Sequence, residues 1–214
     1  MVCDSLVYHP VLSKLIRLLD TNNGREKILR LLQYLNRLLF DSTGNPLNKK
    51  LQQNFALIRK VLRFLKPLTN LQLLAKTWDS AVTATNTTQI KILTAAKHFF
   101  YGGYLFLDQI TLLNALNVVN LNQTKAKKVA RYTNWCWLFG LTSNLLLSLN
   151  KIIQLPSDDT QSKNNSVYKR IAWDSLDLFV VLNNLKFLNT DDANVALAGL
   201  TTSVFGVEDL WSKA

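Results

Sequence analysis

The sequence is poor in the side chains on which enzymes and metal sites depend. Its 214 residues include only two histidines and two cysteines, and Cys3 and Cys136 lie far apart. Two distant cysteines suggest neither a disulfide framework nor a metal cluster, so we expect no metal and no cofactor. The motifs of serine hydrolases, phosphate-binding loops, dinucleotide-binding folds and zinc proteases are also missing from the sequence. The sequence therefore predicts a protein that is not an enzyme.

Acidic residues are scarce in the first third of the chain. Residues 1–78 contain thirteen Lys and Arg against four Asp and Glu, whereas residues 79–214 contain twelve against ten. Most of the net charge of +11 therefore belongs to the N-terminal third. A surface of this charge fits a polyanion, and the two general candidates are phospholipid headgroups and nucleic acid.

One basic segment, residues 57–78, has two distinct faces and contains no acid. At about 100° per residue, the regular part of this segment, residues 57–68, separates apolar from basic side chains. The apolar face consists of Leu57, Val61, Phe64, Leu65 and Leu68. The basic face consists of Arg59, Lys60, Arg63 and Lys66, with Lys76 further along. Pro67 removes a backbone hydrogen bond and is expected to kink the helix.

This pattern has more than one interpretation. A helix with a strong apolar face and a basic face can lie in an anionic membrane, but a surface helix of a soluble bundle looks similar. The single sign of charge favours lipid, because solvated bundle helices usually mix Glu with Lys. Nucleic acid is disfavoured, because the nearby aromatic residues lie on the apolar face and leave no stacking platform among the cations.

Long uncharged runs are also scarce. The best candidate for a membrane span is Tyr132–Asn150, with nineteen residues and no charge. A crossing helix needs about 20 apolar residues, so both one marginal span and a set of packed hydrophobic helices remain open. Phe99–Val119 contains Asp108, which is costly in lipid unless it is paired, and Val195–Val207 is short. The possible membrane segment comprises Trp135, Trp137, Leu138, Phe139, Leu141, Leu145, Leu146 and Leu147.

Helical periodicity runs through almost the whole chain, and no convincing alternating strand is present. The sequence predicts an all-α, membrane-associated bundle of about seven or eight helices, with an amphipathic lipid-inserting helix and a hydrophobic C-terminal half. Gly102–Gly103 is among the expected helix breaks. We expect one domain over residues 1–214. It would contain a basic amphipathic region at 1–78, hydrophobic helices at 89–155, a flexible linker at 156–166 and C-terminal helices at 167–214.

Several unusual runs of residues are more specific than these patterns. They are GREKILRLLQYL at 24–35, RKVLRFLKPL at 59–68, NWCWLFGL at 134–141 and WDSLDLFVVLNNL at 173–185. With these runs, and with its first ten residues and residues 195–211, the chain resembles the peroxin-11 family of peroxisomal membrane-elongation proteins, in particular the yeast members. The resemblance covers essentially the whole length, although residues 155–167 look shorter than the corresponding region of those relatives.

The resemblance implies a protein of the peroxisomal membrane that promotes elongation, proliferation and fission of the organelle. The family's lipid-inserting amphipathic helix corresponds here to residues 57–78. The resemblance also implies self-association and cooperation with a dynamin-related GTPase and its membrane adaptor. Two alternatives remain open, namely a channel for small metabolites, with Asp108 and several Asn side chains along its path, and a scaffold that recruits fission factors.

Overall fold

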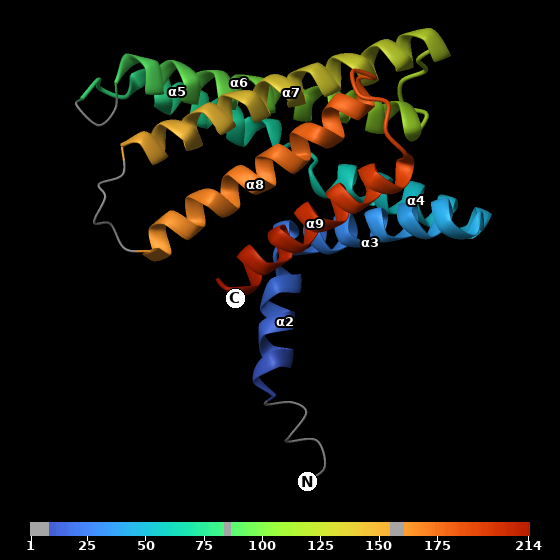
Figure 1. Ribbon diagram of the computed structural model, residues 1–214. Coiled ribbons are helices and arrows are strands. Elements are labelled where there is room, and N and C mark those ends of the chain that lie inside the picture. Colours follow the sequence, from blue (N-terminus) through green and yellow to red (C-terminus); the bar gives the residue numbers. More distant parts are fainter. Residues whose placement is uncertain (1–8, 84–86, 155–160) are drawn as a thin grey trace. The chain divides into compact units, whose positions relative to one another are not determined.

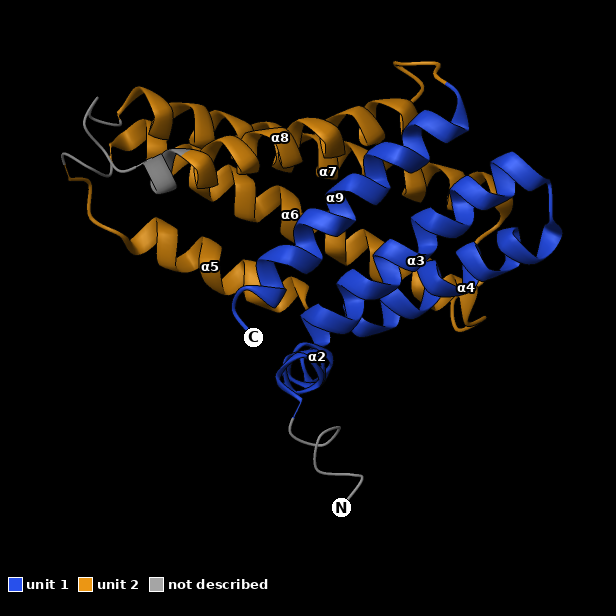
Figure 2. Ribbon diagram, turned by 60° about the horizontal axis from the view of Figure 1, so that its bottom comes forward, with its two compact units in different colours: residues 1–63, 191–214 blue, residues 64–190 orange. Residues whose placement is uncertain are grey.

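The computed structural model describes residues 9–83, 87–154 and 161–214, without the side chains of 161–164. Within these ranges the chain forms eight α-helices and no strand, which confirms the predicted all-α class (Figure 1). The helices are divided between two compact units, which are residues 1–63 with 191–214 and residues 64–190 (Figure 2). The helices are α2 (Pro10–Asp20), α3 (Asn22–Thr43), α4 (Pro46–Leu62), α5 (Pro67–Asp79), α6 (Thr88–Ala115), α7 (Gln123–Ile153), α8 (Gln161–Asn184) and α9 (Asp192–Trp211).

In the first unit, α3 packs against both α4 and α9. The crossing with α9 is close because Gly199 has no side chain, and a Cβ atom there would lie only 2.2 Å from the ring of Tyr34. At the same crossing the Arg30 guanidinium donates a hydrogen bond of 2.9 Å to the Thr202 hydroxyl. The turn from α3 to α4 follows the sequence signals, since Gly44 adopts a left-handed conformation and Asn45 caps the new helix.

The second unit consists of α5, α6, α7 and α8, with α6 packed against α5 and α7, and α7 packed against α8. The predicted break at Gly102–Gly103 is wrong, because α6 continues through both glycines. Their missing side chains serve helix packing instead of a turn, since a Cβ atom on Gly103 would lie 3.3 Å from the Cys136 sulfur on α7. Tertiary packing therefore outweighs the low helix propensity of glycine here.

The expected single helix with a kink at Pro67 is also wrong, because the segment forms two helices separated by a turn. Helix α4 ends at Leu62 and α5 begins at Pro67. Between them Leu65 adopts the left-handed conformation, with φ of 61°, which a non-glycine residue rarely does. Proline is favoured at the first position of a helix, where its missing N–H costs nothing, so Pro67 starts a helix.

The expected flexible linker at 156–166 lies partly outside the described residues, which omit 155–160. From Gln161 onwards its residues belong to the first turns of α8. The expectation that residues 1–214 form one domain remains a prediction.

Candidate membrane-binding surface

The apolar side chains predicted to enter lipid lie mostly in contact with solvent. Val61, at the end of α4, is 48% exposed, and Phe64, Leu65 and Leu68 are between 54% and 59% exposed. Leu57 is only partly exposed. Large apolar side chains this exposed are unfavourable in water and indicate a surface that meets another apolar phase.

The left-handed turn contributes to this exposure. The amide of Leu68 donates a hydrogen bond of 3.1 Å to the carbonyl of Leu65, which closes the turn before α5. Pro67 is buried, while Leu65 and Leu68 on either side of it are exposed. The exposed leucines of the segment therefore lie in the turn and in the first turn of α5, next to a buried proline.

The basic half of the segment is less uniform than its sequence suggests. Arg59 points into the first unit, where its side chain is 11% exposed. Its Nη2 lies 2.6 Å from the Glu26 carboxylate, and its Nη1 donates a hydrogen bond of 2.6 Å to Gln33. We therefore remove Arg59 from the set of proposed headgroup ligands. Among the other predicted cations, Lys76 is exposed, whereas Lys60, Arg63 and Lys66 are partly buried.

The ion pair has a marked effect on Glu26. Burial alone would raise the pKa of this carboxyl, but the charges of Arg59, Lys27 and Arg63 and the hydrogen bond from Arg59 outweigh it and lower the pKa to about 2. Glu26 and Arg59 lie 33 residues apart, on α3 and α4. Helical periodicity cannot reveal such a pairing, which is why the sequence places Arg59 among the lipid-facing cations.

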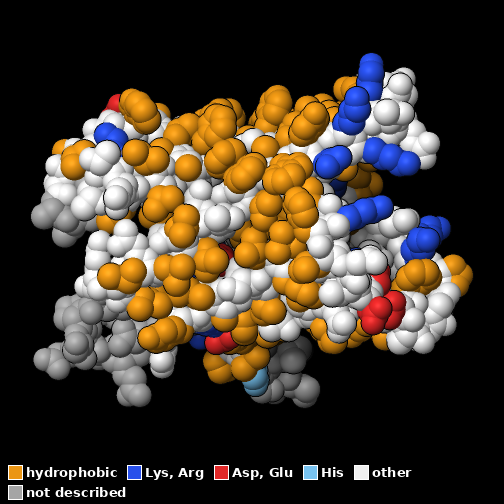
Figure 3. Space-filling model, turned by 45° about the horizontal axis from the view of Figure 1, so that its top comes forward, with side chains coloured by type: hydrophobic (Ala, Val, Ile, Leu, Met, Phe, Trp, Pro, Cys, Tyr) orange, Lys and Arg blue, Asp and Glu red, His pale blue; other side chains and the backbone are white. Residues whose placement is uncertain are grey.

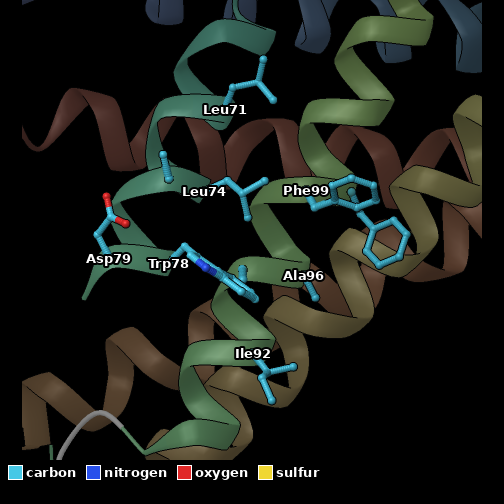
Figure 4. Close-up of a pocket in the computed structure, with 10 residues that line it drawn as sticks. Leu71, Leu74, Trp78, Asp79, Ile92, Ala96 and Phe99 are labelled. Atoms are coloured by element: carbon cyan, nitrogen blue, oxygen red, sulfur yellow. The ribbon is translucent and has the colours of Figure 1, made fainter. Parts of the chain in front are cut away.

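Helices α5 and α6 enclose an apolar groove of about 670 Å³ in the second unit (Figure 4). Leu71, Leu74 and Trp78 line it from α5, and Ile92 and Phe99 line it from α6. The sequence does not predict this groove, because the groove depends on how two helices meet. The only sequence signal was Trp78, a large aromatic residue at the end of α5, which the structure leaves 70% exposed.

Helix α7 contains the predicted membrane segment, and by length and composition it is the one described helix long and apolar enough to cross a membrane. Of the predicted residues, Phe139 and Leu146 are exposed, Leu141 is buried, and the rest are partly exposed. Trp135 stacks on Phe139, with 5.5 Å between ring centroids. The partly exposed residues are Trp135, Trp137, Leu138, Leu145 and Leu147.

The polarity of α7 is the reverse of that in a typical soluble helix. Several of its buried positions are polar, including Ser143, Asn144 and Ser148. Asn144 donates a hydrogen bond to the carboxylate of Asp174 on α8, which also pairs with Arg170 at 3.0 Å. Hydrophobic side chains cover much of the face that α5, α6 and α7 present in Figure 3. Polar groups inside and apolar groups outside are typical of helices that face lipid.

Residues 12–211 match the sequence profile of the family described as Peroxisomal biogenesis factor 11 (PEX11). The chain belongs to the PEX11 family. It is 39% identical to Peroxisomal membrane protein PMP27 of Saccharomyces cerevisiae, over 99% of both chains. It is 28% identical to Peroxisomal membrane protein PMP30B of Candida boidinii, over 99% of this chain and 98% of that one. No solved structure matches the chain significantly.

PEX11 membership establishes what this protein does at a coarse level. It is a non-enzymatic protein of the peroxisomal membrane that acts in peroxisome biogenesis. The exposed apolar side chains of α4, α5 and α7 are consistent with a PEX11 protein, because the acyl chains of a membrane can remove such side chains from water.

Proposed function

We propose that this PEX11 protein elongates the peroxisomal membrane by inserting the α4–α5 segment, residues 57–78, into an anionic leaflet, and so promotes proliferation and fission of the organelle. The observation that carries the proposal is the exposure of Val61, Phe64, Leu65 and Leu68 in a chain that belongs to a peroxisomal membrane family. Fully burying one side chain of this size contributes roughly 1.5–3 kcal/mol, so four of them favour insertion even when each is only partly buried.

Insertion into one leaflet provides a physical route to elongation. Apolar side chains that enter below the headgroups expand that leaflet relative to the other and favour positive curvature. Lys60, Arg63, Lys66 and Lys76 would hold the segment at anionic headgroups, each contributing on the order of 1 kcal/mol. Arg59 would act indirectly, by holding α4 against α3 through Glu26.

Tubulation of anionic liposomes by the purified full-length chain tests this proposal. We expect the double variant Val61→Glu and Phe64→Glu to stop tubulation, because each buried charge costs an insertion energy on the order of 2–3 kcal/mol. Leu47→Glu is the matched control, since Leu47 is equally exposed but lies at the other end of α4. Normal tubulation by the double variant, in electron micrographs, would contradict the proposal.

The proposal extends to partners by family membership. We propose that the chain self-associates in the membrane and works with a dynamin-related GTPase and its membrane adaptor. Crosslinking of the full-length chain in liposomes, with and without these partners, measures both associations.

A further inference from the structure

The first turns of α7 carry a second group of cations, separate from the α4–α5 segment. The group, which we call the α7 basic end, consists of Lys125, Lys127, Lys128 and Arg131, all of them exposed. None of the four forms an ion pair with any residue that the structure describes. The sequence also contains no Asp or Glu between residues 109 and 157. This positive charge is therefore not neutralised by acids on α7 itself or on the preceding loop.

The α7 basic end is open because α8 stops short of it. The loop after α8 reaches α7 at Trp135, whose ring lies 5.6 Å from that of Phe187. The residues of α7 before Trp135 extend for roughly 18 Å at 1.5 Å per residue. α8 itself ends at Asn184, whose amide donates a hydrogen bond of 3.5 Å to Asn134 near the end of this stretch. Gln123, Thr124 and three of the cations line a shallow depression of about 250 Å³, large enough for a phosphate-containing headgroup.

The side-chain types along α7 follow the order of the layers of a membrane, from the headgroups to the acyl chains. The cations come first, and an aromatic layer follows, with Tyr132 and Phe187 exposed and Trp135 partly exposed. Beyond this layer, α7 continues without charge to Asn150. Cations suit anionic headgroups, tyrosine and tryptophan are enriched at the headgroup boundary, and uncharged apolar residues suit the acyl region. Figure 3 shows Lys and Arg side chains gathered at the end of the apolar face.

We propose that the α7 basic end binds the headgroups of anionic phospholipids, with Tyr132, Trp135 and Phe187 at the boundary between headgroups and acyl chains. Charge complementarity supplies the attraction, and the aromatic layer selects a lipid surface over nucleic acid. Trp135 is already packed against Phe139 and Phe187, so part of its ring is not open to a base. The site shares no residue with the α4–α5 segment and does not rest on the proposed function.

Flotation with liposomes tests this site in the full-length chain, synthesised in a cell-free system with phosphatidylcholine liposomes that contain or lack phosphatidylserine. The test variant is Lys127→Glu with Lys128→Glu. The matched control is Lys49→Glu with Lys50→Glu, another exposed lysine pair in the first two turns of a helix, α4. We expect the test variant to bind phosphatidylserine liposomes at least about tenfold more weakly than the unaltered chain, and the control pair to bind within about threefold of it.

Each outcome decides the proposal. A loss confined to the test variant and to phosphatidylserine liposomes supports it, and Lys127→Gln with Lys128→Gln should then show an intermediate loss while circular dichroism keeps its helical signal. An equal loss of liposome binding in the test variant and in the control variant would overturn it, because binding would then depend on the total charge of the chain. Unchanged binding by the test variant would overturn it as well. Tubulation by the α4–α5 variants is read separately, so the two proposals can fail independently.

Discussion

The buried ion pair between Glu26 and Arg59 connects α3 to α4 at the scale of single residues. Both side chains are almost fully removed from water, and Gln33 accepts a further hydrogen bond from the same guanidinium. A buried pair of this kind does not by itself imply high stability, because desolvation offsets much of the attraction. Removal of one partner is costly, however, since it leaves the other charge buried without compensation.

We predict that Glu26→Gln lowers the free energy of unfolding by roughly 3 kcal/mol, because it removes the Glu26 charge that faces the nearly buried Arg59 guanidinium. Thermal unfolding of the detergent-purified chain, followed by circular dichroism, measures this change. Asp41→Asn is the control, since Asp41 is an exposed acid near the end of the same helix, α3. A Glu26→Gln variant as stable as the control would show that the pair contributes little.

The same carboxyl predicts a pH dependence. The pKa of Glu26 is lowered to about 2 in the folded chain, whereas an unfolded Glu titrates near a pKa of about 4.3. The unfolded state therefore takes up the proton first as the pH falls. The contribution of Glu26 to stability is complete above about pH 5 and decreases by roughly 2–3 kcal/mol as the pH falls towards 2. Between pH 5 and pH 2.5, the free energy of unfolding should decrease less in Glu26→Gln than in the unaltered chain.

At the scale of elements, the helices pack through a few small residues whose role depends on the partner helix. Gly199 admits the ring of Tyr34 at the crossing of α3 and α9, and Gly103 admits Cys136 at the crossing of α6 and α7. Both glycines lie inside helices, where glycine is intrinsically unfavourable by about 1 kcal/mol. Close packing between helices offsets that cost.

We predict that Gly199→Ala destabilises the first unit by about 1–3 kcal/mol, because the new methyl group would overlap the Tyr34 ring and force one helix to move. The measurement is again thermal unfolding in detergent. Leu197→Ala, an exposed change two residues away on α9, should have a much smaller effect. If both variants unfold at the same temperature, the crossing is looser than the structure indicates.

The element scale also shows what the sequence could and could not predict. Most helices follow from periodicity, and the turn at Gly44 and Asn45 follows from capping rules. The predicted break at Gly102–Gly103 is wrong, and the close neighbour of Gly103, Cys136, belongs to another helix that periodicity cannot reveal. Pro67 was assigned a kink because a proline signals a change in a helix without distinguishing a bend from a new start.

In the candidate site, too, the sequence predicts some features and not others. Val61, Phe64 and Leu68 are exposed, but they do not share a side of one helix, because Val61 lies in α4, Phe64 in the turn and Leu68 in α5. Their role as a membrane-inserting face stays a prediction. The buried position of Arg59 could not be predicted from the sequence, because its partner Glu26 lies on a different helix. The groove between α5 and α6 was missed for the same reason.

At the scale of the whole molecule, the proposed function depends on the net charge and on the exposed apolar side chains. In the mechanism that we propose, the net charge of +11 would provide long-range attraction to an anionic membrane, and the exposed apolar residues of α4, α5 and α7 would provide short-range insertion. PEX11 membership identifies the membrane as that of the peroxisome. The central claim is that residues 57–78 enter the lipid rather than pack permanently against protein.

Fluorescence from a single residue tests that claim most directly. In a full-length chain with Cys3 and Cys136 replaced by serine, Leu68→Cys would carry an environment-sensitive dye, and Ser42→Cys, an exposed position at the end of α3, would carry it as the control. On anionic liposomes we expect the dye at position 68 to shift to shorter wavelength and to be quenched by labelled acyl chains, while the control stays in water. If the dye at position 68 still emits as it does in water when anionic liposomes are present, the account is contradicted.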